Sequence, residues 1–181
     1  YPNTFGFSMR RKAEVHKDGT LEFSGSMISN LANTSDIAEV IETNTGGTMD
    51  QYVPALSPSV VYKTSNFQIY AEYVRALRHF DAAELAHLGA GAQPSAVTAE
   101  FKFYPTSSRR FPEGFNVMLG YSYSDEASGL SIPRHSTYAS VGGYFSKHVA
   151  HSLHYRYNDR YDGTEADVSR HEVIGQVSVV F

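Results

Sequence analysis

Apolar and polar side chains alternate along this chain from one end to the other. The clearest run is residues 115–124, where the odd positions hold Phe115, Val117, Leu119, Tyr121 and Tyr123. The even positions of the same run hold Asn, Met, Gly and Ser. Successive side chains of a β-strand point to opposite faces, so this run predicts a strand with one apolar face and one small or polar face. A helical period is absent apart from a short turn near residues 82–90, and the pattern therefore predicts an all-β fold.

The same alternation predicts further strands along the chain, at residues 20–29, 55–63, 66–76, 96–104, 137–146, 148–158 and 170–181. A ninth segment, 4–15, is weaker because Arg11 falls on its apolar face. The connections are short at 16–19, 64–65 and 146–147, and long at 30–54, 77–95, 125–136 and 159–169. Short turns on one rim and long loops on the other are typical of an antiparallel transmembrane β-barrel of the bacterial outer membrane. We therefore expect residues 1–181 to form such a barrel, or the C-terminal half of one.

Composition excludes several other classes of protein and of partner. A chain of 181 residues fits one domain. It has no run close to the roughly 18 apolar residues of a membrane-spanning helix. The strands of a transmembrane barrel also lack such a run, because their apolar and polar residues alternate. A formal charge of -4 without a basic block argues against a nucleic-acid partner. With no cysteine, disulfides and thiolate metal sites are excluded.

Aromatic residues are abundant, with 13 Tyr and 11 Phe. If the last strand descends to the periplasm and directions alternate, the apolar face carries Phe at the periplasmic end and Tyr at the outer end. Amphipathic rings favour membrane–water interfaces, so we predict interface positions for Phe67, Phe101, Phe103, Phe115, Phe145 and Phe181, and for Tyr73, Tyr121, Tyr123, Tyr155 and Tyr157. The competing interpretation is a soluble β-sandwich in which these rings form a buried core.

The number of strands bears on whether the chain is a whole barrel. Single-chain bacterial barrels normally have an even number of strands, and nine predicted strands break that rule. Either residues 4–15 do not span, which leaves an eight-stranded barrel, or further strands precede Tyr1. An open sheet edge in lipid would leave backbone donors and acceptors without partners, so a half-barrel is not a stable end state.

Four stretches of the chain, taken in order, carry a family resemblance. They are GSMISNLANTSD at 25–36, NFQIYAEYVRALRHFDAAELAHLGAGAQPSAVTAEFKFYP at 66–105, GYSYSDEASGLSIPRHSTYASVGGYFSKH at 120–148 and YRYNDRYDGTEADVSRHEVIGQVSVVF at 155–181. Together they resemble the C-terminal half of the siderophore porin family typified by the legiobactin receptor. The resemblance implies uptake of a ferric siderophore through a barrel of about sixteen strands, wide enough for an aqueous channel, whereas eight strands leave a filled interior. The chain has no counterpart of the family's N-terminal half, so the resemblance implies that the chain is part of a larger barrel.

Charged residues at polar strand positions are the first candidates for solute contact. We predict that the lumen is faced by Glu72, Glu100, Lys102, His154, Arg156 and Glu172. The structural alternative is that these charges pair across strands and brace the wall. For an anionic ferric chelate, attraction would come from the outer-loop cations Arg75, Arg78, His79, Arg134, His135 and Arg160, which can equally hold lipopolysaccharide phosphates.

Two patterns suggest metal binding, and neither supports it well. His148, His151 and His154 are spaced three residues apart. On a strand this spacing directs the ring of His151 to the face opposite the other two. Asp159, Asp162, Glu165 and Asp167 depart from the twelve-residue calcium loop and lack its closing glutamate. We therefore expect no metal and no cofactor.

Three functions follow from these patterns. The first is a porin-like barrel that passes or binds a small solute, and the second is a non-conducting barrel within a larger surface assembly. The third, a barrel enzyme with Ser or Asp beside a His at the outer rim, lacks a recognisable motif, and we expect no enzyme. The expected partners are outer-membrane lipid, lipopolysaccharide and the barrel-assembly machinery, the last through a C-terminal strand ending in Phe181.

Overall fold

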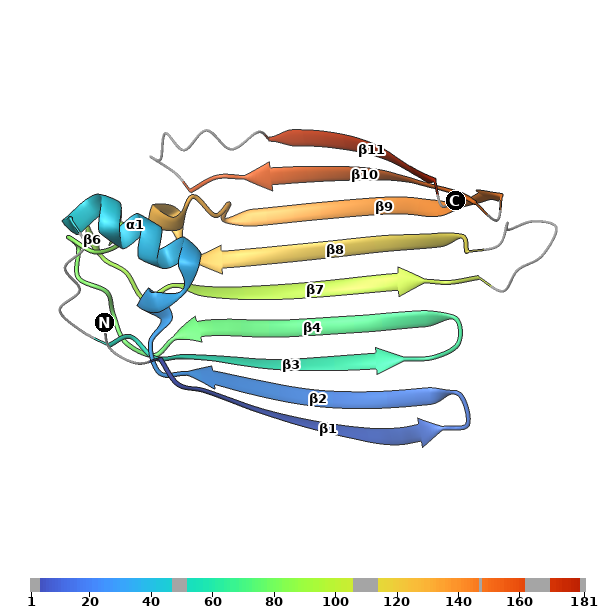
Figure 1. The fold of residues 1–181 in the computed structure, drawn as a ribbon, viewed down its shortest axis with the longest axis horizontal. Helices are drawn as coiled ribbons and strands as arrows, with labels where there is room; N and C mark the ends of the chain where they lie inside the picture. The colour runs from blue at the N-terminus through green and yellow to red at the C-terminus, as the bar shows by residue number, and fades with distance from the viewer. Residues whose placement is uncertain (1–3, 47–51, 106–113, 147, 162–169, 180–181) are drawn as a thin grey trace.

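The computed structural model of the chain describes residues 4–46, 52–105, 114–146, 148–161 and 170–179. Nine strands form one antiparallel sheet in which each strand pairs with its neighbours in the chain (Figure 1). They are β1 (Gly6–His16), β2 (Gly19–Ile28), β3 (Ala55–Lys63), β4 (Phe67–Ala76), β7 (Ser95–Phe103), β8 (Asn116–Asp125), β9 (His135–Ser146), β10 (Val149–Asp159) and β11 (His171–Val179). The prediction of a mainly antiparallel β fold is confirmed.

The weak ninth segment is a full strand. β1 pairs with β2 along its length, from Gly6 opposite Ile28 to His16 opposite Gly19. The alternative in which residues 4–15 stay outside the sheet is therefore wrong. Arg11 does lie on the apolar side, opposite Phe23, as the alternation required.

The sheet has two edges in the described residues. β1 pairs there with β2 alone, and β11 with β10 alone, so the strands form an open sheet and not a closed barrel (Figure 1). Both edge strands run in the same direction, because Gly6 and His171 lie at the end of the sheet where the long connections are. We call this the loop end and the opposite end the turn end.

The two faces of the sheet differ as the alternation predicts. One face, called here the apolar face, carries large side chains that are exposed among the described residues: Phe23 is 54% exposed, Leu119 53% and Val177 68%. Register places these residues in rows with other apolar positions, such as Leu119 opposite Ala139 and Phe101. The other face, called the polar face, carries mainly hydroxyl, amide and charged side chains.

A hydrophobic core lies at the loop end, outside the sheet. Helix α1 (Ser35–Thr45), the 3-10 turns η1 (Leu31–Asn33) and η2 (Ser128–Leu130), and the short strands β5 (Ala86–His87) and β6 (Ala90–Gly91) gather there (Figure 1). Their segments bury Ile41, Val53, Phe80, Leu85 and Ala92 against one another. We call this unit, built from described residues of 29–54, 77–94, 126–134 and 160–161, the cap.

The cap covers the polar face. The strand residues buried at the loop end, Ala55, Ala76, Ser124 and Asn158, all belong to that face by register. The described parts of the long connections therefore fold over the polar face and do not cover the apolar face.

Helix α1 was not predicted. Its apolar residues are few, chiefly Ile37, Val40 and Ile41, and Gly46 ends it in the left-handed conformation with φ 71°. Packing against the distant Phe80 and Leu85 stabilises this short helix, which local periodicity does not reveal. Of the short helical turn expected near residues 82–90, only the first part is present, closed by Leu85 N–H donating to the Asp81 carbonyl, whereas β5 and β6 form a short hairpin in the remainder.

No helix of the described residues combines the length and the apolar character needed to cross a membrane.

Candidate solute-facing polar surface

All six predicted solute contacts lie on the polar face. Register puts Glu72 opposite Thr98, Glu100 opposite Tyr70, and Lys102 opposite Gln68. On the last strands Arg156 lies opposite Glu172, and His154 opposite Ile174 and Ser140. The sequence pattern therefore grouped these residues on one side of the sheet.

The polar face contains a row of hydrogen-bonding side chains that crosses eight strands in register. We call it the hydroxyl row: Arg10, Ser24, Ser59, Glu72, Thr98, Ser122, Ser136 and Asn158. Some neighbours in the row bind one another, with hydroxyl oxygens 2.6 Å apart in Ser24 and Ser59 and 3.3 Å apart in Thr98 and Ser122. The Ser136 hydroxyl donates to Asn158 Oδ1 at 2.8 Å. The result is a continuous polar band.

A second row lies one step closer to the turn end. We call it the charged row: Lys12, Glu22, Val61, Tyr70, Glu100, Gly120, Tyr138, Arg156 and Glu172. The charged row borders the hydroxyl row along its whole length. In the centre of the row Glu100 lies between two tyrosines: Tyr70 is its direct neighbour, and Tyr138 follows after Gly120.

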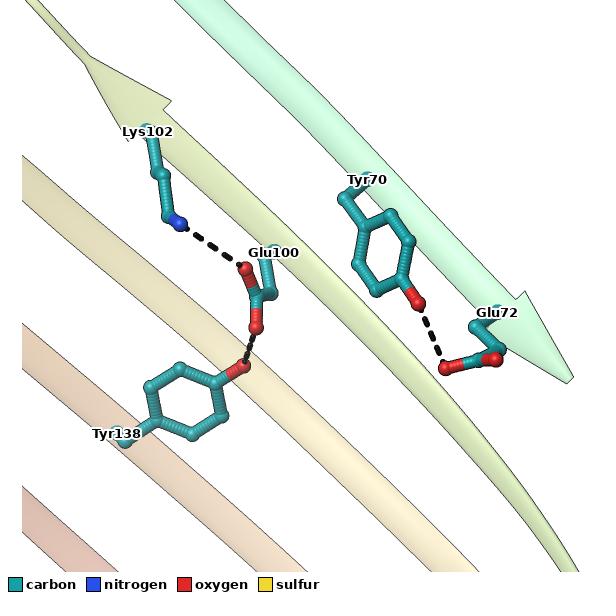
Figure 2. A network of polar contacts seen from close by, with 5 residues as sticks. All are labelled: Tyr70, Glu72, Glu100, Lys102 and Tyr138. Carbon is teal, nitrogen blue, oxygen red and sulfur yellow. Dashed lines mark hydrogen bonds and ion pairs between the residues drawn. The ribbon is translucent and has the colours of Figure 1, made fainter. Parts of the chain in front are cut away.

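Tyr138 reaches across a whole strand to bind Glu100 (Figure 2). Its hydroxyl on β9 donates to Glu100 Oε1 on β7 at 2.6 Å, although β8 lies between them. The gap is bridged because position 120 on β8 is glycine: a Cβ there would lie 2.0 Å from Cζ of Tyr138. Gly120 therefore provides the space that the tyrosine ring occupies. Lys102 Nζ lies 3.6 Å from the other Glu100 oxygen.

Glu72 is bound by hydroxyls from two strands. Tyr70 on the same strand donates to Glu72 Oε2 at 2.6 Å (Figure 2), and the Ser57 hydroxyl on β3 donates to Oε1 at 2.5 Å. Sequence reasoning singled out the two glutamates and missed Tyr70, Tyr138, Ser57 and Gly120. Their polar or small character at polar-face positions of the strands was the available signal, but only the register shows which of them meet.

Ion pairs account for much of the remaining charge. Arg10 and Glu22 lie 3.0 Å apart, and Arg156 and Glu172 lie 3.8 Å apart, each pair across two neighbouring strands. Both geometries support the alternative in which such charges brace the sheet. A hollow of about 500 Å³ lies over this region, lined among others by Glu100, Tyr138, His154, Arg156, Glu172 and Gln176. The braced charges thus still border open space.

The predicted loop cations occupy different surroundings. Arg75 and His135 belong to the apolar face by register, opposite Leu56 and Tyr123. Arg78 and His79 are exposed beyond the end of β4, while Arg134 and Arg160 are partly buried within the cap. The six cations therefore do not form one cluster above the polar face.

Aromatic rings gather at both ends of the apolar face. At the turn end the ring centroids of Phe67 and Phe101 are 6.1 Å apart, with Phe103 and Phe115 close to the same end. At the loop end Tyr121 and Tyr155 bind His135 and His171 by hydroxyl-to-Nδ1 contacts of 2.7 and 3.0 Å. The separation is incomplete, since Phe7 also lies at the loop end. The remaining predicted positions are Tyr73, Tyr123 and Tyr157 at the loop end, with Phe181 and the side chain of Phe145 outside the described residues.

No group of three or more potential metal ligands occurs in the part of the chain that the structure describes. His151 lies opposite Gly143 on the apolar face and His154 opposite Ser140 on the polar face, which confirms that they do not share a site. The acidic segment considered for calcium falls largely outside the described residues, because 162–169 are not among them.

One serine–histidine contact lies at the loop end. His87 Nδ1 is 2.8 Å from the Ser128 hydroxyl, and the edge of the His87 ring meets Tyr161 with centroids 5.2 Å apart. Tyr161 in turn binds Ser124 at 2.7 Å. The contact therefore links β5 to η2 within the cap, and it is the kind of Ser–His proximity at the rim that the barrel-enzyme alternative requires.

Comparison of the chain with protein-family models, with curated proteins and with solved structures gives no match.

Proposed function

We propose that the chain forms the wall of an outer-membrane β-barrel that passes or binds a small polar solute. The observation that carries this proposal is the apolar face, where Phe23, Leu119, Leu153 and Val177 are each more than half exposed. Soluble proteins rarely expose continuous apolar patches of more than a few hundred Å². Hydrocarbon is the surrounding in which such a face is stable, and the aromatic rings at its two ends suit the two membrane interfaces.

The soluble β-sandwich is the weaker interpretation. A sandwich would bury these apolar side chains against a second sheet. In the described residues the second, two-stranded sheet belongs to the cap, which packs on the polar face. This arrangement favours lipid over water as the environment of the apolar face.

The two edges support closure by additional strands. β1 and β11 both run from the loop end to the turn end, so direct pairing between them would be parallel. An odd number of further strands is needed to close the barrel with antiparallel pairs throughout. This parity agrees with the larger barrel that the resemblance to siderophore porins implies.

The polar face supports a solute path because two register rows of hydrogen-bonding groups line it. The proposal that the solute is a ferric siderophore rests on the family resemblance, and the scattered positions of Arg75, His135 and the other loop cations add no support to it. Contacts with lipopolysaccharide remain proposals for Arg75 and His135, which lie at the loop end of the apolar face. We propose no enzymatic activity.

The cap favours a second candidate, a barrel that does not conduct. Its buried core folds over the polar face and covers one end of it. Such a cap suits a structural or interaction barrel within a larger surface assembly.

Conductance of the full-length protein in a planar lipid bilayer distinguishes the porin-like barrel from the non-conducting barrel. The porin proposal predicts stepwise conductance that rises when the cap segment 77–92 is replaced by a short glycine–serine turn. Insertion without conductance, in both the intact and the shortened protein, would refute solute passage and favour the non-conducting barrel.

A further inference from the structure

Glu72 differs from the other carboxylates of the two register rows. The ion pairs among the described residues join Arg10 to Glu22, Lys102 to Glu100, and Arg156 to Glu172. Glu72 takes part in none of these pairs, although it lies in the middle of the sheet on β4. Its negative charge therefore has no counter-ion among the described residues.

The hydrogen bonds of Glu72 fix its carboxylate and leave it able to bind more. Oε1 accepts one hydroxyl hydrogen bond, from Ser57, and Oε2 accepts one, from Tyr70. Each carboxylate oxygen has two lone-pair positions. One position on each oxygen is therefore available to another donor, and the two hydroxyls hold the group in place.

A hollow of about 230 Å³ opens beside this carboxylate. Its lining includes Glu72, Arg10 and the hydroxyl-bearing Ser8, Ser24, Ser26, Ser57 and Ser59. Arg10 is three strands away from Glu72 in the hydroxyl row and is neutralised by Glu22 at 3.0 Å. The hollow thus combines one uncompensated negative charge with several neutral hydroxyls.

We propose that this hollow binds the ammonium group of a positively charged organic solute, with Glu72 as its counter-ion. The inference rests on the proposed function, in which the polar face lines the path of the solute. A protonated amine has three N–H donors, which match the two available lone pairs of Glu72 and a serine oxygen. A calcium ion fits less well, because one carboxylate and neutral hydroxyls fall short of its usual six to eight strong oxygen ligands.

The test is a binding titration of the full-length protein in detergent micelles, with n-butylammonium as the probe and n-butyrate as its anionic counterpart. Wild type should bind butylammonium and not butyrate. Glu72→Gln should weaken binding about tenfold, since it removes the charge from a charge-assisted hydrogen bond. The matched control Glu14→Gln should stay within about twofold, because Glu14 lies on the polar face of β1 but does not line the hollow.

Two further measurements keep the result decisive. Ser57→Ala keeps the charge of Glu72 but removes one hydroxyl that orients it, so it should weaken binding by a smaller factor. If Glu72→Gln does not fold, as judged by its far-ultraviolet circular dichroism, Ser57→Ala still tests the site. Equal binding by wild type and Glu72→Gln, equal losses in Glu72→Gln and Glu14→Gln, or displacement of the amine by micromolar calcium would each overturn the ammonium site. Binding in a protein that does not conduct would refute solute passage alone, and conductance without binding would refute the ammonium site alone.

Discussion

Phe80 in the cap and Leu119 in the sheet are both large apolar side chains, yet their surroundings are opposite. Phe80 is 1% exposed within a cluster of other apolar residues, whereas Leu119 is 53% exposed in the middle of β8. The cap is packed as the interior of a soluble protein is. The sheet instead places its small and polar side chains inward, toward the cap, and its apolar side chains outward.

The difference supports the proposal that the cap lies in water and the apolar face of the sheet meets lipid. The core of the cap is stabilised by removal of apolar surface from water, the ordinary driving force of folding. The apolar face of the sheet gains nothing in water, and its hydrogen-bonded backbone suits a medium that offers no partners to unpaired groups. Each region can be perturbed by a change that leaves the other intact.

The largest expected effect comes from Phe80→Ala. Loss of a fully buried phenylalanine costs about 3–5 kcal/mol, because a cavity remains in the core. Hydrogen exchange should accelerate strongly in residues 31–45 and 77–92 and remain unchanged in β7 to β10. The matched change Phe101→Ala, at a position 40% exposed on the apolar face, should leave cap exchange unaltered. Equal protection of the cap in both variants would contradict a separate cap core.

A charge on the apolar face should have the next largest effect. Leu119→Arg is expected to destabilise the protein folded in lipid vesicles by about 2–4 kcal/mol, the typical penalty for a cation facing the middle of the bilayer. Ser122→Arg, three residues further along the same strand, points to the polar face and should cost much less. The measurement is the urea midpoint of folding into vesicles. Similar midpoints for both variants would remove the distinction between the two faces.

A smaller effect is expected at the site where Tyr138 crosses β8. Gly120→Ala places a methyl group where the Tyr138 ring lies and should cost about 1–3 kcal/mol by overpacking, with loss of the bond to Glu100. Gly25→Ala is the control, since no heavy atom lies within 4 Å of its new Cβ. Thermal unfolding followed by circular dichroism compares the two variants. If Gly25→Ala is as destabilising as Gly120→Ala, the crossing contact is not the cause.

The smallest effect concerns Tyr161, which joins the cap to the sheet. Burial raises the pKa of its phenol, so the proton is held to higher pH in the folded cap than in the unfolded chain. Stability from this group is therefore complete below the ordinary tyrosine pKa of about 10 and is lost as the pH rises through the raised value. Tyr161→Phe should cost about 0.5–1.5 kcal/mol through its lost hydrogen bonds. An ultraviolet titration difference between wild type and Tyr161→Phe should show one phenol that ionises late, and an ordinary ionisation would contradict its burial.

The strands were predictable from the sequence because alternation is a local property. Residues 55–63 were predicted without error, and the weak segment 4–15 became β1 despite Arg11. Helix α1 was missed because its stability depends on Phe80 and Leu85, about forty residues away. The candidate site was predicted as a face and not as a set of contacts. Glu100 meets Tyr138 only because register aligns both with Gly120, and no local pattern contains that alignment.

The most direct test of the central claim is a spin-label scan along β8. The chain contains no cysteine, so single cysteines introduced one at a time at residues 117–119 and 121–123 carry unique labels. In protein reconstituted in lipid vesicles, labels at 117, 119, 121 and 123 should be relaxed by lipid-soluble oxygen, and labels at 118 and 122 by a water-soluble nickel complex. Nickel access at the odd positions equal to that at the even positions would show that the apolar face does not meet lipid.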